Sequence, residues 1–182
     1  MTTLKAEKRD MQTKAKKLRR EGYVTGNVFG KTIDGSIPVQ FPKSEVEQLL
    51  KTKNKGSQII LEIDGEKINV LIKEIDFNSM KHQVDEIDFQ ALVSGEKVHS
   101  TAEIILINHE KVTAGVIQQM LEEIPFKALP EALVEKIEID VAQMHIGDTI
   151  KVKDLEIASD KDVTLQIDPE EIVVTLMESH NA

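Results

Sequence analysis

The residues with the clearest chemical potential are the three arginines, and all of them lie within the first twenty residues. Eight basic side chains fall in this segment: Lys5, Lys8, Arg9, Lys14, Lys16, Lys17, Arg19 and Arg20. Only Glu7 and Asp10 oppose them, so the segment carries +6, whereas the remaining residues hold 15 basic and 30 acidic groups. Because the planar guanidinium binds phosphate and guanine in bidentate fashion, this pattern predicts a site for a polyanion that the rest of the chain supports or displays.

Other chemistries find little support in the sequence. The chain has no cysteine, and its five histidines show neither HExxH spacing nor any pairing typical of a metal site. No glycine-rich phosphate loop and no GxSxG elbow occurs. Pairs of neighbouring carboxylates are expected by chance in a chain with 32 acidic residues. We therefore expect no enzyme, no catalytic or metal-binding residue, no cofactor and no small-molecule substrate.

The basic side chains need an element that presents them. Residues 3–9 alternate as a short strand does, and Asp10 or Thr13 is a suitable cap for a helix that runs to about Glu21 and stops at Gly22. On this helix Met11, Ala15 and Leu18 would form one narrow apolar face, with cations over the rest. Such a helix docks on a small domain and displays charge. A merely solvated lysine-rich face is the alternative, and the apolar face is too thin for membrane insertion.

The following residues predict a small barrel. Residues 23–41 read as two strands joined at Asp34-Gly35, and a short helix with capping-box spacing at Ser44 and Glu47 comes next. Residues 57–76 read as a hairpin, because an Asp-Gly pair between alternating apolar runs is a strong signal of a type I′ turn. A further strand covers residues 84–93. The fold class is mostly β: a six-stranded, closed or nearly closed barrel with two or three short helices.

The second half differs in charge. Residues 95–182 hold 7 basic and 18 acidic side chains, which argues against contact with a phosphate backbone. Strand-like runs, one of them at 148–157, alternate with Gly, Pro and Asp turns and predict a second, mainly antiparallel β domain. Residues 116–124 are compatible with a helix or a strand. We expect domains at 1–93 and 94–182. No run approaches a membrane span or a signal peptide, and the absence of cysteine suits the cytosol.

Several segments, in this order, resemble a known family. They are KKLRREG on the basic helix, NVFG at a strand end, IPVQF, the Asp-Gly hairpin, DEIDFQ, and IGDTIKVKDL in the acidic half. Together they are similar to the Ctc-type general stress protein, the two-domain form of the bacterial large-subunit ribosomal protein that binds 5S rRNA. The resemblance covers essentially the whole chain. It implies a cytoplasmic, ribosome-associated protein whose barrel grips the minor groove of the loop E region of 5S rRNA.

The resemblance also implies which residues contact RNA. Arg9, Lys16, Lys17 and Arg19 match basic contacts of the family, and Phe29 stands where Tyr is usual. Lys73 lies on the strand expected to face RNA, and Asp88 matches the Asp of an H-x-D-F segment. The full set of expected RNA-binding residues is Arg9, Lys14, Lys16, Lys17, Arg19, Arg20, Phe29, Lys73, Asp76, Glu86 and Asp88. The acidic domain is expected to contact neighbouring ribosomal proteins or rRNA.

The chain departs from the family pattern at the expected RNA surface. Glu86 occupies the histidine position of the H-x-D-F segment, and Asp76 stands where Gln is typical. Carboxylates near RNA repel phosphate unless they accept hydrogen bonds from bases or hold a cation. A second hypothesis therefore stands beside the ribosomal one: a free stress-related protein-interaction module of the same fold, with weakened or altered RNA binding.

Overall fold

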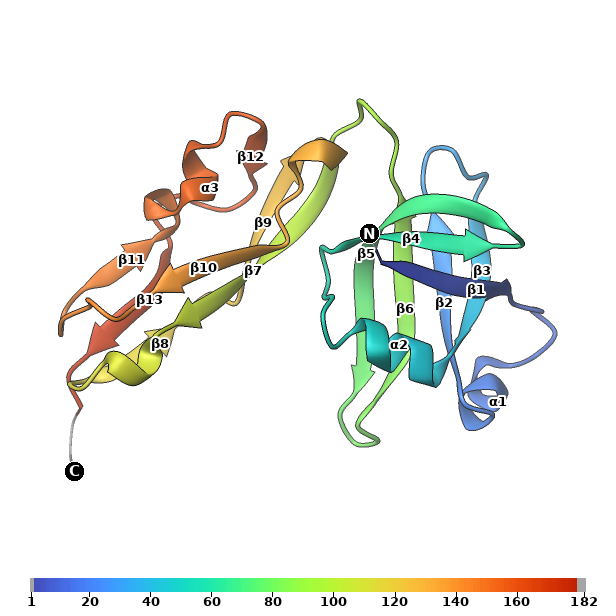
Figure 1. Ribbon diagram of the computed structural model, residues 1–182, viewed down its shortest axis with the longest axis horizontal. Helices are drawn as coiled ribbons and strands as arrows, with labels where there is room; N and C mark the ends of the chain where they lie inside the picture. The colour runs from blue at the N-terminus through green and yellow to red at the C-terminus, as the bar shows by residue number, and fades with distance from the viewer. Residues whose placement is uncertain (1, 180–182) are drawn as a thin grey trace. The chain divides into compact units, whose positions relative to one another are not determined.

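A computed structural model describes residues 2–179 and shows two compact units, which divide between Glu96 and Lys97 (Figure 1). Each unit has its own core of buried aliphatic and phenylalanine side chains. The protein is mostly β with short helices, so the expected fold class is confirmed. In the described residues no helix is long and apolar enough to cross a membrane.

Unit 1 is a closed barrel of six strands in the order β1-β3-β2-β6-β5-β4. The strands are β1 (Thr3–Lys8), β2 (Tyr23–Phe29), β3 (Ser36–Pro42), β4 (Gln58–Ile63), β5 (Glu66–Asn78) and β6 (Gln83–Ala91). Two short helices accompany them, α1 (Ala15–Arg20) and α2 (Lys43–Leu49). Parallel pairing of β1 with β4 and of β2 with β6 closes the sheet, and the other neighbours are antiparallel. Closure leaves this sheet without a free edge.

Local chemistry explains the clearest hairpin of the barrel. Asp64 and Gly65 join β4 to β5 with φ of 51° and 85°, and two consecutive positive values are what a type I′ turn requires. In β4 the side chains of Ile59, Leu61 and Ile63 alternate into the core. The predicted hairpin is therefore confirmed, together with its Asp64-Gly65 turn.

The helix starts differ from the sequence predictions. α1 has only six residues, its N-cap is Lys14, and no side chain caps it. Asp10 instead accepts a hydrogen bond from the backbone N–H of Gln12, which forms a local turn before the helix. Met11 lies before α1 and is exposed, so the expected apolar face is wrong at that residue, whereas Leu18 is buried as expected.

The capping box expected on α2 is also absent. Its N-cap is Pro42, and neither Ser44 nor Glu47 takes a capping role. Proline fits there because its missing N–H is one of the donors that the first turn of a helix leaves unused.

Unit 2 contains two sheets. One has the strand order β10-β7-β9-β12 and the other β11-β13-β8. The strands are β7 (Val98–Ile107), β8 (Val116–Gln119), β9 (Glu123–Ala128), β10 (Lys136–Asp140), β11 (Thr149–Lys151), β12 (Val163–Leu165) and β13 (Ile172–Met177). The short helices are η1 (His109–Lys111), η2 (Pro130–Ala132), η3 (Val152–Asp154) and α3 (Glu156–Ser159). Pairing is antiparallel except between β7 and β10.

Two local features of unit 2 settle or overturn expectations. Residues 116–119 form a strand, because β8 pairs with β13. The strand expected at 148–157 is wrong beyond Lys151, since η3 and α3 follow it. Asp154 accepts a hydrogen bond from the Lys151 N–H at 2.8 Å, and this turn ends the ladder.

Candidate nucleic-acid interface

The outer face of β2, β6 and β5 gathers polar side chains in rows. Thr25 lies opposite Glu86, and Glu86 in turn lies opposite Asp76. The next row pairs Glu74 with Asp88. Because residues opposite one another in a sheet point to the same face, this surface carries four carboxylates, Glu74, Asp76, Glu86 and Asp88.

Irregular pairing in β5 sets these rows. The register of β5 against β6 shifts between Ile72 and Glu74 and again between Asp76 and Phe77. Each shift adds a residue to one strand and redirects the side chains that follow. Asp76 therefore reaches the row of Glu86, and Phe77 is left 55% exposed.

Close contact between β2 and β6 requires Gly26. A Cβ at this position would meet the carbonyl oxygen of Ile87, which belongs to the backbone and cannot turn aside. The two strands that carry Thr25 and Glu86 thus lie side by side only because residue 26 has no side chain.

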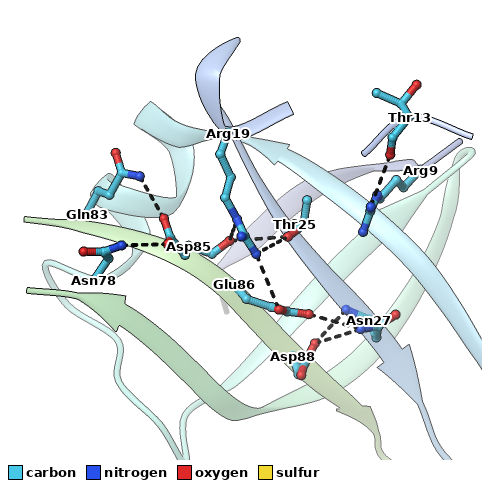
Figure 2. Close-up of polar contacts among 10 residues, drawn as sticks. All are labelled: Arg9, Thr13, Arg19, Thr25, Asn27, Asn78, Gln83, Asp85, Glu86 and Asp88. Carbon is cyan, nitrogen blue, oxygen red and sulfur yellow. Dashed lines mark hydrogen bonds and ion pairs between the residues drawn. The ribbon is translucent and has the colours of Figure 1, made fainter. Parts of the chain in front are cut away.

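Arg19 joins helix α1 to this face (Figure 2). Its Nε donates to the carbonyl oxygen of Asp85 at 3.0 Å, and its Nη2 donates to Thr25 Oγ1 at 3.3 Å. Nη2 also lies 3.7 Å from Oε2 of Glu86. The Arg19 side chain is 27% exposed, so strand groups hold the guanidinium in place while part of it faces solvent.

Asn27 orients the two carboxylates of β6. Its backbone N–H donates to Oδ1 of Asp88 at 2.8 Å, and its Nδ2 lies 3.3 Å from the same oxygen (Figure 2). Nδ2 also lies 3.4 Å from Oε1 of Glu86. These bonds point both carboxylates toward β2, and Glu86 also faces the Arg19 guanidinium.

Glu86 is the electrostatically perturbed residue of the face. Burial raises the pKa of its carboxyl, and the neighbouring charges of Asp88 and Asp76 raise it further. Arg19 and Arg9 act in the opposite direction without cancelling the effect. Arg9, Arg19, Asp76 and Asp88 are therefore all near enough to Glu86 for their charges to affect its pKa.

Asp85 secures the end of the β5–β6 hairpin. Its carboxylate accepts hydrogen bonds from Asn78 at 3.0 Å and from Gln83 at 2.8 Å, and these bonds lower its pKa (Figure 2). Since its carbonyl oxygen accepts from Arg19, the same residue ties α1 to the hairpin.

The remaining predicted residues spread around this cluster. Arg9 follows β1, and its Nη2 donates to the carbonyl oxygen of Thr13 at 3.2 Å (Figure 2), while its Nε is buried without a hydrogen-bond partner. Phe29 is half-buried at the end of β2, opposite Gln90. The exposed cations of the α1 segment are Lys14, Lys16, Lys17 and Arg20.

Lys73 lies away from the Arg19 cluster. It occupies the first register shift of β5, where burial lowers the pKa of its ammonium and the nearby charge of Lys55 lowers it further. The structure thus brings together Arg9, Arg19, Asp76, Glu86 and Asp88, and it places Phe29, Lys73 and the α1 lysines outside that group.

Sequence reasoning missed Thr25, Asn27 and Asp85. The alternation of β2 held a usable signal, since Val24 and Val28 point inward and the intervening polar residues must share the outer face with Phe29. The role of Asp85 had no such signal, because its main contact to Arg19 is made by a backbone oxygen.

The cluster can present donors and acceptors to a ligand. The guanidinium of Arg19 offers N–H groups, and the carboxylates of Glu86 and Asp88 offer acceptor oxygens. Across residues 2–179 no group of three or more His, Asp and Glu side chains is arranged to hold a metal ion. The site therefore presents both hydrogen-bond donors and acceptors beside a cationic helix.

The fold and this site define a two-domain β protein whose barrel carries a polar face beside a basic helix. Residues 4–89 match the family model described as the Ribosomal L25p family, and residues 97–180 match that of the ribosomal protein TL5 C-terminal domain. The chain is 30% identical over 179 residues to the large ribosomal subunit protein bL25 of Listeria monocytogenes, covering 96% of this chain and 85% of the relative.

Two further relatives carry the same name. The protein of Bacillus velezensis is 29% identical over 181 residues, covering 97% of this chain and 88% of its own. The protein of Thermoanaerobacter sp. is 28% identical over 178 residues, covering 96% of this chain and 88% of the relative. The chain belongs to the Ribosomal L25p family, in its form with a TL5-type C-terminal domain. Membership in a family of ribosomal proteins agrees with the expectation of a protein that is not an enzyme.

Proposed function

We propose that this protein is a structural component of the large ribosomal subunit and that its barrel domain, residues 1–93, binds the loop E region of 5S rRNA. The relatives from Listeria and Bacillus, named as large-subunit proteins, support the first part. The resemblance of the chain to the 5S rRNA-binding family supports the second. Its partners are 5S rRNA and the large subunit, and it takes no small molecule and no membrane.

The anchored guanidinium of Arg19 carries this proposal. Nε and Nη2 are engaged by Asp85, Thr25 and Glu86, whereas Nη1 has no hydrogen-bond partner within residues 2–179. A guanidinium has five N–H donors, so two remain for a ligand. Because the fork is already held, binding RNA costs little of the side-chain entropy that a free arginine would lose.

The carboxylates fit RNA as acceptors from bases. The wide, shallow minor groove of A-form RNA displays base edges and 2′-hydroxyl groups, both of which include hydrogen-bond donors. Asp88 and Glu86 lie beside Arg19 with their oxygens held by Asn27. In our proposal Arg19, Arg9 and the α1 cations bind phosphates, while Asp88 and Glu86 accept hydrogen bonds from base or ribose donors.

The test is a titration of 5S rRNA with the full-length protein at several salt concentrations. If about six phosphates are neutralised, log Kd should change with log salt with a slope of magnitude about 4 to 5, at roughly 0.7 to 0.9 per contact. A matched RNA with its loop E replaced by a regular helix should bind more weakly. Absence of binding at low salt, or a slope near zero, would contradict the proposal.

The second domain, residues 94–182, contacts neighbouring ribosomal proteins or rRNA in our proposal. Its excess of acidic residues suits basic partners better than a phosphate backbone. Titrating 5S rRNA with the full chain and with residues 1–93 separates the contributions of the two domains to RNA binding. Equal 5S rRNA affinity is expected from both, because the barrel is a closed unit with its own core.

One observation favours a second function, that of a free stress-related protein-interaction module. The four carboxylates on the outer face of β5 and β6 are more than a phosphate-binding surface needs. A protein bound to ribosomes co-sediments with the large subunit in a sucrose gradient, whereas a free module stays at the top. That distribution decides between the two functions.

A further inference from the structure

Unit 2 contains a groove with an apolar floor beside the edge strand β10. The groove has a volume of about 710 Å³ and lies between β10 and the segment that contains η3 and α3. Its floor includes Ile139, Leu155 and Ile157, which are 5–7% exposed. β10 and α3 can be followed in Figure 1.

One side of this groove is a strand edge that pairs with no other strand of residues 2–179. β10 is the terminal strand of its sheet and pairs with β7 alone. At the two ends of this ladder, the N–H of Glu103 donates to the carbonyl of Glu135, and the N–H of Val141 donates to the carbonyl of Ile107. In a parallel ladder alternate residues bond to the same neighbour, so residues 136, 138 and 140 direct their N–H and C=O groups to the opposite side.

The rim of the groove is strongly acidic. Its charged lining consists of one ammonium and five carboxylates: Lys136, Glu138, Asp140, Asp154, Glu156 and Asp160. Three of the carboxylates accept hydrogen bonds from nearby N–H groups: Asp140, Asp154 and Asp160. The side-chain carboxylates of Glu138 and Glu156 have no hydrogen-bond or ion-pair partner within residues 2–179. The charge of the rim is therefore largely available to a ligand.

We propose that this groove binds an extended, basic polypeptide segment of another protein, which adds to β10 as a further strand. Main-chain hydrogen bonds to residues 136, 138 and 140 give such a strand its register, and alternate side chains give selectivity. Apolar residues on one side cover the isoleucine and leucine floor, and lysine or arginine on the other side meets the carboxylates. The charge of the rim disfavours RNA and anionic membranes.

The direct test uses the full-length protein and a synthetic, end-blocked peptide of alternating lysine and valine. We expect saturable binding by calorimetry that weakens as salt is added, and chemical-shift changes centred on the residues that line the groove, in 134–140, 150 and 154–160. A glutamate-valine peptide of the same length should not bind. If the lysine-valine peptide does not bind, or shifts residues elsewhere, the proposal is wrong.

Charge variants test the rim. The double variant Glu138→Gln with Glu156→Gln should weaken binding by roughly 2- to 10-fold, as expected for two partly exposed ion pairs. The matched control is Glu171→Gln with Glu178→Gln, which changes the charge of unit 2 equally at exposed positions outside the groove. Equal loss in both variants would show only a general charge effect and would overturn the proposal.

Backbone variants test strand addition. Glu138→Pro removes an N–H that points into the groove and spares the ladder to β7, and proline is tolerated on the open side of edge strands. It should bind much more weakly than Glu138→Gln, which keeps the N–H. Should the proline variant fail to fold, methylation of alternate backbone nitrogens in the peptide gives the same test. Unchanged affinity for the methylated peptide would refute strand addition.

Discussion

The guanidinium of Arg19 lies 3.7 Å from the carboxylate of Glu86. Glu86 is the residue that stands at the histidine position of the H-x-D-F segment. Arg19 also donates to the carbonyl of the preceding residue, Asp85, so a single side chain spans two consecutive residues of β6. The cation from α1 therefore offsets part of the cost of placing an acidic residue here. The same contact holds the guanidinium for a ligand.

Replacement of Arg19 should weaken 5S rRNA binding more than replacement of Arg20. Arg19→Ala should cost about 1–3 kcal/mol of binding free energy. Arg19→Lys should restore only part of it, because an ammonium cannot engage Asp85, Thr25 and a phosphate with the geometry of a planar fork. Arg20→Ala is the control, since Arg20 is exposed on the same helix. Equal losses from the two alanine variants, measured by gel-shift titration, would contradict the anchored role.

The affinity for 5S rRNA should rise as the pH falls toward the raised pKa of Glu86. That pKa is raised by burial and by Asp88 and Asp76, and protonation removes a negative charge from the proposed RNA surface. Glu86→Gln keeps an oxygen that can accept a hydrogen bond from a base or ribose but lacks the charge that repels phosphate. It should therefore bind more tightly than the native protein at neutral pH and should lose much of this pH dependence. The native protein and Glu86→Gln contain the same histidines, so histidine protonation affects both equally. If the RNA affinity of the variant rises more steeply with falling pH than that of the native protein, the role of Glu86 is disproved.

The same residue should affect stability with a definite sign. A raised carboxyl pKa means that the folded protein binds the proton more tightly than the unfolded chain, so ionisation lowers stability as pH rises above the ordinary value of 4.5. Glu86→Gln should therefore raise the free energy of unfolding at neutral pH, with the difference fading below pH 4.5. Urea denaturation followed by fluorescence of Tyr23, the single tyrosine, reports on the barrel.

Gly26→Ala should destabilise the barrel. The added Cβ would meet the Ile87 carbonyl oxygen, so β2 and β6 must separate. Overpacking of this kind costs typically 1–3 kcal/mol. Gly22→Ala is a useful control, because its Cβ meets nothing and only its positive φ of 88° is strained. A Gly26→Ala variant as stable as the native protein, again by Tyr23 fluorescence, would show that the strands can separate without cost.

Much of the barrel was predictable because its signals are local. Asp64-Gly65 and the alternation of Ile59, Leu61 and Ile63 act within a few residues, and both were read correctly. The start of α1 was not predicted correctly. The Asp10 side chain can either cap a helix or close a local turn, and here its hydrogen bond from the Gln12 N–H forms the turn. Propensity alone does not decide between such options.

The candidate site was predictable in its members but not in its geometry. The resemblance named Arg19, Glu86 and Asp88, but not the Asn27 that orients the two carboxylates. The register shift at Lys73 of β5 places Asp76 opposite Glu86, and bulges depend on how the barrel closes, not on adjacent residues. Long-range pairing of this kind left no mark in the sequence.

Glu170 should titrate far below an ordinary glutamate. Lys153 and Lys151 donate to its two carboxylate oxygens at 2.6 and 2.9 Å, and they lower its pKa from 4.5 to about 2. A depressed pKa gives stability that is present above 4.5 and is lost as the pH falls toward 2. Carboxyl carbon shifts measured by NMR should show a midpoint near 2 in the native protein, and Lys153→Ala should move it back toward 4.5. Lys161→Ala, with no ion pair to Glu170, should leave the midpoint unchanged. A native midpoint near 4.5 would mean that these lysines do not hold the carboxylate in solution.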